Sequence, residues 1–224
     1  MAGDRRRRRE NVSTRRLEAY TDGIFAIAAT LLVLDLSIDG FGAIKSDARL
    51  WDALVGLHDH FTSFFISFLL LCLLWVVHTR QFEHVRRVDS TVLTLNSLRL
   101  LAVVLIPFTT SINSAYNALP LGRSLMPANF FVVILFGSMQ WFYLTAQGRG
   151  MVEGMTQERI RATRWANVTV VVVGAGVVAL APLIGSWAFA LFVVNGPIET
   201  ALMRRDAKRH PVSPGSPATS ADNG

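Results

Sequence analysis

The chain has 224 residues, of which 51% are hydrophobic, and its formal net charge is +6 at pH 7. Strong hydrophobicity together with positive charge is typical of a membrane protein and argues against a basic soluble domain. The basic residues flank apolar segments instead of covering a folded face, so we expect no binding to nucleic acid. The one cysteine, Cys72, lies within an apolar segment, which excludes a disulfide framework and a cysteine metal site.

Apolar segments of about 20 residues, separated by polar breaks, predict an all-α membrane protein with six transmembrane helices. In chain order we place these helices at residues 17–38, 59–79, 91–113, 125–146, 163–184 and 186–203. The third and sixth segments are the least typical of transmembrane helices. They contain polar side chains, which must face protein or water and not lipid. Pro182 and Gly185 close the fifth segment, and they predict a tight turn that makes a hairpin of the last two helices.

Arginine and lysine concentrate in alternate connections, at residues 80–87 and 149–164, and in both terminal segments. The positive-inside rule places these stretches in the cytoplasm, and an even number of spans then puts both termini there. We therefore predict a multi-pass protein of the cell membrane with a basic cytoplasmic arm (1–15), a transmembrane domain (16–204) and a disordered cytoplasmic tail (205–224). The run Arg5–Arg9 is interpreted as a solvated arm that touches anionic lipid.

Sequence motifs for other chemistries are missing. Residues 58–60 read His-Asp-His, but three adjacent side chains cannot converge on one ion, so we predict no metal site. The sequence has no nucleophile elbow, phosphate-binding loop or metalloprotease helix, so we expect neither an enzyme nor a cofactor. The carbonyl filter sequence TVGYG is absent, and any ion selectivity must therefore come from side chains.

The first predicted helix carries one distinct face. Residues 16–36 read RLEAYTDGIFAIAATLLVLDL, and at about 100° per residue the side chains of one stripe lie within about 60° of Ile27: Ile24, Thr30, Leu31 and Leu34. Asp22 lies about 140° away and needs a partner within its own subunit. The candidate partners are Trp75, His78, Asn96 and Arg99. From the pattern alone, ordinary helix packing is a better explanation of the stripe than a pore, and the pattern by itself does not identify a pore.

Arg16, Tyr20, Thr21 and Asp22, followed by FAIAATLLVLDL, resemble the first-helix signature of the transmembrane protein 175 potassium-channel family, which is Arg, three residues, then Phe-Ser-Asp. The similarity continues through residues 67–112, where Trp75, His78, Asn96 and Pro107 stand at the family's spacing. Tyr20 and Thr21 replace Phe and Ser and keep the ring and the hydroxyl. The phenol adds a hydrogen-bonding group at the cytoplasmic mouth.

The resemblance implies a fold and a function. A single six-helix repeat resembles the prokaryotic members, which are homotetramers in which the first helix lines a central pore. It implies a potassium-selective, weakly discriminating cation channel, with potassium ions and the lipid bilayer as partners. In that arrangement Ile27, Leu31 and Leu34 form a hydrophobic constriction, and Thr30 adds a ring of four hydroxyls.

The resemblance also implies that a structural network holds the pore helix in place, and its residues are Arg16, Tyr20, Thr21, Asp22, Trp75, His78, Asn96 and Arg99. Asp35 and the acidic outer loop are expected to raise the local cation concentration at the outer mouth. A secondary transporter or a non-conducting membrane scaffold remains the alternative. A transporter is expected to show an internal repeat and broken helices, and the two halves of this sequence show no repeat.

Overall fold

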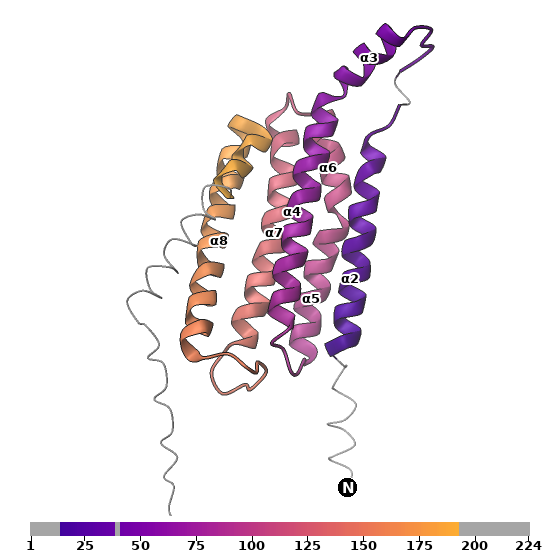
Figure 1. The fold of residues 1–224 in the computed structure, drawn as a ribbon. Helices are drawn as coiled ribbons and strands as arrows, with labels where there is room; N and C mark the ends of the chain where they lie inside the picture. Colours follow the sequence, from indigo (N-terminus) through magenta and orange to yellow (C-terminus); the bar gives the residue numbers. More distant parts are fainter. Residues whose placement is uncertain (1–13, 39–40, 193–224) are drawn as a thin grey trace, which may run out of the picture.

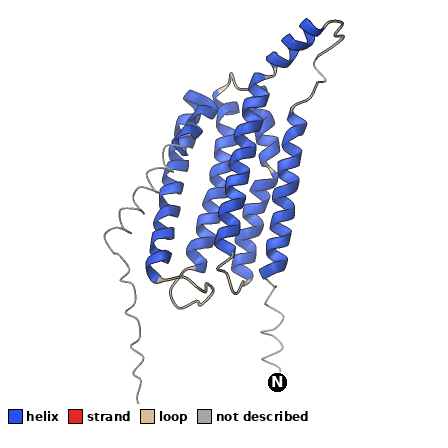
Figure 2. Cartoon of the chain, viewed as in Figure 1, coloured by secondary structure: helices blue, strands red, loops and turns tan. Residues whose placement is uncertain are grey.

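The computed structural model of the chain describes residues 14–38 and 41–192, which are helical with short connections. The long helices stand side by side in a single bundle, with α2 at one edge and α8 at the other (Figure 1, Figure 2). In chain order the elements are α2 (Thr14–Leu31), the 3₁₀ turn η1 (Leu32–Asp35), α3 (Asp47–Gly56), α4 (His58–Phe82), α5 (Ser90–Val104), α6 (Ile106–Ala115), α7 (Pro120–Leu144), α8 (Gln157–Ile184) and the 3₁₀ turn η2 (Gly185–Phe189).

Within the described residues, five helical segments are long and apolar enough to cross a membrane. They are Thr14–Asp35, His58–Phe82, Ser90–Ala115, Pro120–Leu144 and Gln157–Phe192, and they overlap the first five predicted spans with ends shifted by a few residues. Residues 193–203 of the sixth predicted span lie outside the described residues, as do the arm residues 1–13 and the tail 205–224. The described part of the chain is therefore an all-α bundle of membrane-type helices.

Two features of the fold differ from the sequence prediction. The third span is divided at Leu105 into α5 and α6, because Pro107 in the first turn of α6 has no N–H to donate to the carbonyl of Val103. The predicted loop at 39–58 contains the helix α3, which begins after Ser46. The Ser46 hydroxyl accepts from the backbone N–H of Arg49 at 3.4 Å, a capping arrangement that a Ser-Asp pair favours.

The turn at the end of α8 forms where Pro182 and Gly185 predict it. Gly185 has a φ of 60°, in the left-handed region that glycine adopts without strain. The chain then reverses so that the Phe189 ring packs edge-on against Phe130 of α7, with ring centroids 5.7 Å apart. Phe192 also packs against this apolar core.

The helix α7 is the most enclosed of the spans. It packs against α5, α6 and α8, and 56% of its apolar stretch is buried, against 28% for α2. The core around it includes Leu71, Ile106, Met126 and Phe130, and a second apolar cluster surrounds Trp141. Because α2 contacts only one side of the bundle, much of its surface is left for water, lipid or another subunit.

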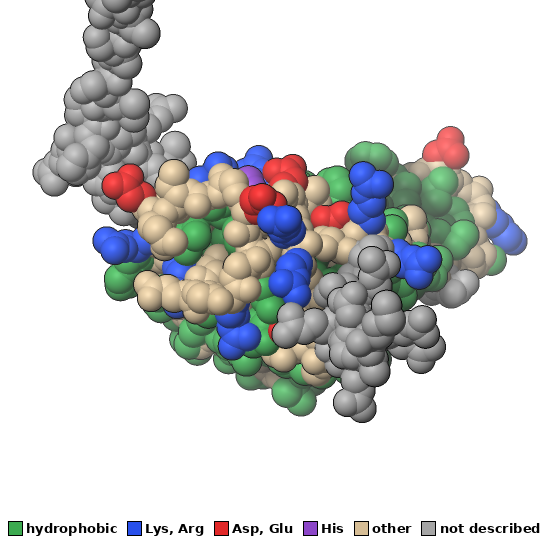
Figure 3. Space-filling view, turned by 90° about the horizontal axis from the view of Figure 1, so that it is seen from below, with side chains coloured by type: hydrophobic (Ala, Val, Ile, Leu, Met, Phe, Trp, Pro, Cys, Tyr) green, Lys and Arg blue, Asp and Glu red, His purple; other side chains and the backbone are tan. Residues whose placement is uncertain are grey.

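One end of the bundle carries the basic connections. The start of α2 and the two segments 83–89 and 145–156 lie at this lower end, where arginine side chains spread over the surface (Figure 1, Figure 3). The two segments are tied together, since Arg86 N–H donates to the Met151 carbonyl at 2.8 Å and Glu153 N–H to the His84 carbonyl at 2.9 Å. The structure thus gathers on one face the charges that the positive-inside rule assigns to the cytoplasm.

Asp89 at this end links the start of α5 to α7. Its carboxylate accepts from the Val92 N–H at 3.0 Å and from the Tyr143 hydroxyl at 2.7 Å, while the Arg149 guanidinium lies 3.8 Å from the centre of the Tyr143 ring. Partial burial alone would raise the pKa of Asp89, but hydrogen bonds to the carboxylate and the nearby Arg149 lower it below its usual value. The ionised form is therefore the one that stabilises the fold.

This depressed pKa predicts an acid-dependent loss of stability. The contribution of Asp89 is fully present above about pH 4, its unfolded pKa, and is lost as the pH falls through its lower folded pKa. The melting temperature is measured for wild type and Asp89→Asn between pH 7 and pH 3. At neutral pH wild type should have the higher melting temperature, and the difference between the two proteins should become smaller under acid conditions. A difference that stays constant across this range would show that the charge of Asp89 contributes nothing.

Candidate ion-conducting helix and its supporting network

The stripe predicted on the first helix lies on the outside of the described bundle. Ile27 is 60% exposed and Leu34 is 70% exposed, and Thr30 and Leu31 are exposed beside them. The opposite side of α2 is buried against α4, α5 and α6 through Thr21, Phe25, Ala28 and Leu32. Ile24, which the helical wheel includes in the stripe, is half-buried and packs against the core instead. A helix that exposes this much aliphatic surface is available to line a pore or to contact a partner.

Thr30 is the polar member of this face. Its hydroxyl donates to the Ile27 carbonyl one turn earlier, with an oxygen to oxygen distance of 2.8 Å. Because the proton is used within the helix, the lone pairs of the hydroxyl oxygen remain available on the exposed side. The side chain can therefore present a partial negative charge to a cation.

Three consecutive residues of α2 point in three directions, as a rotation of about 100° per residue requires. Tyr20 is exposed on the same side as Ile27 and lies apart from the network assigned to it. Thr21 is buried and its hydroxyl accepts from the Asn96 amide of α5 at 3.0 Å. The Asp22 carboxylate accepts from the Trp75 indole N–H of α4 at 2.8 Å. Hydrogen bonds thus attach α2 to two neighbouring helices at one level.

His78 and Arg99 form the buried centre of this network. Arg99 Nη1 lies 2.9 Å from His78 Nδ1, and Arg99 Nη2 donates to the Leu74 carbonyl at 3.3 Å. A guanidinium can only donate, so Nδ1 accepts and the imidazole carries its proton on Nε2. Gly137 of α7 leaves room for the guanidinium, since a Cβ there would lie 3.3 Å from Arg99 Cζ. Arg16 is exposed at the start of α2, below this centre.

Phe25 connects α2 to that pair, and sequence reasoning did not identify it. Its ring stacks on His78 with centroids 6.3 Å apart, and Arg99 Cζ lies 5.8 Å from the ring centre. His78 in turn packs on Phe82 with centroids 4.2 Å apart. The helical wheel places Phe25 about 160° from Ile27, on the buried side, which is the one signal that could have found it.

Asp35, which follows the outer end of α2, does not have the environment expected of a residue that attracts cations to the outer mouth. Its side chain is only 7% exposed, accepts from the Ser114 hydroxyl of α6 at 2.8 Å, and lies 3.3 Å from His60 Nδ1 of α4. A carboxylate that is enclosed and paired in this way attracts few cations to the outer mouth. Asp35 instead attaches η1 to α4 and α6.

Sequence reasoning also missed a group of buried, hydrogen-bonded polar side chains near Asp35. Asn113 of α6 donates to the Ser63 and Ser186 hydroxyls at 2.9 and 3.0 Å, and the Ser67 and Thr110 hydroxyls lie 2.8 Å apart. Small hydroxyl residues inside apolar segments have no periodicity of their own, so only the packing of α4 against α6 brings them together.

Comparison with known proteins places this arrangement in a family. The family model described as Endosomal/lysosomal potassium channel TMEM175 matches residues 16–107, which contain the α2 stripe and the whole of the network. A potassium channel of Streptomyces collinus is 32% identical over 156 residues, which are 66% of this chain and 73% of that one. The chain belongs to the TMEM175 family. Its resemblance to the prokaryotic members is thereby confirmed.

This chain is also similar to TMEM175 proteins of animals and to a solved structure of a TMEM175 homolog. The human endosomal/lysosomal proton channel TMEM175 is 35% identical over 116 residues, which are 50% of this chain and 23% of the human protein. A crystal structure of a lysosomal potassium-selective channel TMEM175 homolog from Chamaesiphon minutus superposes with a TM-score of 0.70 at 25% identity. That superposition covers 84% of this chain and 97% of the other. The bundle described above is therefore the TMEM175 fold.

Proposed function

We propose that this protein is a potassium-selective, weakly discriminating cation channel, built as a homotetramer in which α2 of each subunit lines a central pore. The observation that carries the proposal is the aliphatic face of α2, which is turned away from the core of its own subunit in a chain that belongs to the TMEM175 family. Relatives named as potassium channels in Streptomyces collinus and Chamaesiphon minutus support potassium as the permeant ion.

Four copies of the stripe would make a hydrophobic neck. Ile27 and Leu34, with Leu31 between them, are seven residues apart along the chain, so the neck is about 10 Å long at about 1.5 Å per residue. A narrow aliphatic neck loses its water readily, and an ion must shed part of its hydration shell to pass. Potassium holds its water less tightly than sodium does, so the neck favours potassium.

Thr30 would supply the polar step within this neck. Four hydroxyl oxygens, each with its proton held by the Ile27 carbonyl, can replace part of the water that the ion loses. Thr21, Asp22, Trp75, His78, Asn96 and Arg99 would then act as a brace that fixes the angle of α2 against α4 and α5. The basic end would face the cytoplasm, in accordance with the positive-inside rule.

Flux and assembly test this proposal together. Full-length protein in potassium-loaded vesicles should release potassium faster than sodium, and native mass spectrometry should give a mass of four chains. A stable monomer with no flux would identify a scaffold. Uptake against a gradient, coupled to a second ion, would identify a secondary transporter.

Thr30→Val tests the hydroxyl ring. Valine keeps the shape of threonine but removes the oxygen, so the preference for potassium over sodium should fall roughly fivefold, which corresponds to a contact of about 1 kcal/mol. Assembly should be unchanged. The matched control is Thr169→Val on α8, whose hydroxyl donates to the Trp165 carbonyl at 3.1 Å in the same way. Equal selectivity in both variants would remove Thr30 from the ion pathway.

A further inference from the structure

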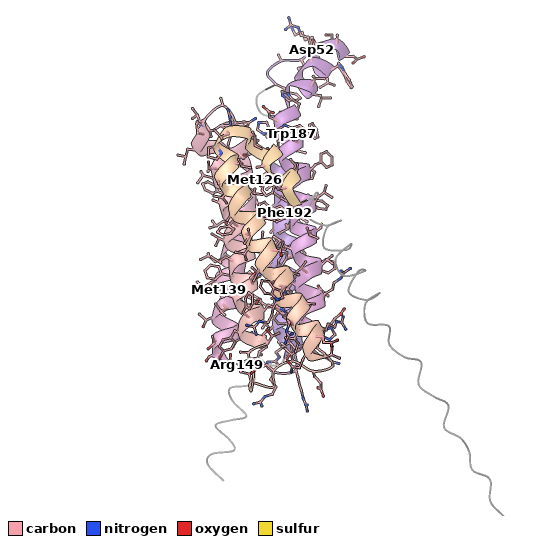
Figure 4. All side chains as sticks on the ribbon, turned by 90° about the vertical axis from the view of Figure 1, so that its left-hand side faces the viewer. Asp52, Met126, Met139, Arg149, Trp187 and Phe192 are labelled. Atoms are coloured by element: carbon pink, nitrogen blue, oxygen red, sulfur yellow. The ribbon has the colours of Figure 1, made fainter. Side chains whose placement is uncertain are left out.

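An exposed tryptophan lies near each end of the helix α8. Trp165 lies near the basic end, and Trp187 lies just beyond the other end of the helix, where it is labelled in Figure 4. Between residue 165 and the end of α8 at residue 184 the helix rises about 28 Å, close to the thickness of a hydrocarbon core of about 30 Å. Exposed tryptophans at this separation mark the two membrane interfaces.

A cavity of about 330 Å³ opens between α7 and α8 at the level of Trp165. Its lining combines polar and apolar side chains from the two helices and their connection: Phe142, Thr145, Gln147, Gln157, Ile160, Arg161, Arg164, Trp165 and Val168. The cavity therefore lies where lipid headgroups meet the acyl chains.

The cavity is positively charged. Arg161 and Arg164 are its two charged lining residues, and no carboxylate lines it within the described part of the chain. The ion pairs found among residues 14–38 and 41–192 involve neither arginine. Arg164 Cζ lies 5.0 Å from the centre of the Phe142 ring, which positions that guanidinium and leaves its donors available.

The apolar part of the lining leads away from the charged part toward the membrane. Arg161, Trp165 and Val168 follow one another along one side of α8 at spacings of four and three residues. Their order places a cation nearest the basic end of the bundle and a valine about 10 Å deeper, at about 1.5 Å per residue. A ligand with an anionic head and an apolar tail matches this order.

We propose that this cavity binds an anionic phospholipid, with the phosphate between Arg161 and Arg164 and an acyl chain along Trp165 and Val168. A lipid fits better than free phosphate, because half of the lining is apolar and the cavity lies on the edge of the bundle away from α2. This site exists whether or not α2 lines a pore. It goes beyond the proposed conduction, and its test needs no measurement of flux.

Quenching of tryptophan fluorescence by brominated lipids tests the site directly, because Trp165 lines it. Full-length protein in detergent is titrated with phosphatidylglycerol brominated on its acyl chains, and in parallel with brominated phosphatidylcholine. Phosphatidylglycerol should quench at the lower concentration, and Trp165→Phe should remove this saturable component. In the double variant Arg161→Gln, Arg164→Gln the half-quenching concentration should rise about 25-fold, or about fivefold for each arginine.

Arg159→Gln is the matched control, since Arg159 is exposed on the same helix, loses the same charge and does not line the cavity. It should titrate like wild type. Equal weakening in Arg159→Gln and the double variant, or equal quenching by the two lipids, would overturn the site. Complete relief of quenching by excess inorganic phosphate would overturn the lipid assignment. If the double variant does not assemble, Arg161→Gln alone, with its exposed side chain, should still show the fivefold shift.

Discussion

Ile27→Asn should raise cation flux and lower the preference for potassium over sodium. In a tetramer this substitution would place four amide groups in a ring that is otherwise aliphatic, so water would remain in the neck and ions would keep more of their hydration. A barrier lowered by about 1.4 kcal/mol, comparable to one hydrogen bond, would raise flux roughly tenfold. Vesicle flux with potassium and with sodium on the same preparation measures both effects.

The control for Ile27→Asn is Val172→Asn. Val172 is 65% exposed, close to the 60% of Ile27, but it lies on α8, which packs chiefly against α7 and η2 on the far side from α2. This variant should leave both flux and selectivity unchanged. If Ile27→Asn instead lowers the stability of the assembly and leaves flux as it was, then the α2 face packs against another subunit and does not contact ions.

The positions of the helices could be predicted because apolar length is a strong signal. Each of the first five predicted spans overlaps an observed segment, and the turn at Gly185 follows from proline and glycine chemistry. The break at Leu105 and the helix α3 could not be placed in the same way. A proline in a span is compatible with a kink, a break or an intact helix, and a ten-residue helix outside the membrane has too few apolar positions to give a period.

In the candidate site, the sequence predicts that a polar side chain needs a partner, but only the packing of the helices determines which partner it has. The wheel separates Asp22 from Ile27 and so predicts that the carboxylate needs a partner, but four candidates remained and only the packing of α4 selects Trp75. The same limit applied to Asp35, whose position at the outer end of the first span suggested a role at the outer mouth. Its burial depends on Ser114 and His60, which come from other helices and cannot be inferred from the first helix alone.

His78→Ala should destabilise the protein more than Asp22→Ala does, although both residues belong to the proposed brace. His78 is buried between Phe25 and Phe82, and its loss would leave a cavity and would also remove the acceptor for Arg99 Nη1. The expected cost is about 3 kcal/mol. Asp22 is exposed and accepts from a partly exposed Trp75, so its loss should cost about 1 kcal/mol.

Conservative variants separate these hydrogen bonds from packing. His78→Asn keeps an acceptor on Cγ at the level of Nδ1. By accepting from Arg99 it should recover part of the stability lost in His78→Ala. Asp22→Asn keeps an oxygen for the Trp75 indole and should recover nearly all of the stability lost in Asp22→Ala. Thermal unfolding and the yield of assembled protein measure both series. Equal losses for His78→Ala and Asp22→Ala would contradict the burial-based ranking. Normal assembly of Asp22→Ala with altered ion selectivity would show that the Asp22 carboxylate faces the permeant ions, which would move it from the brace into the pore.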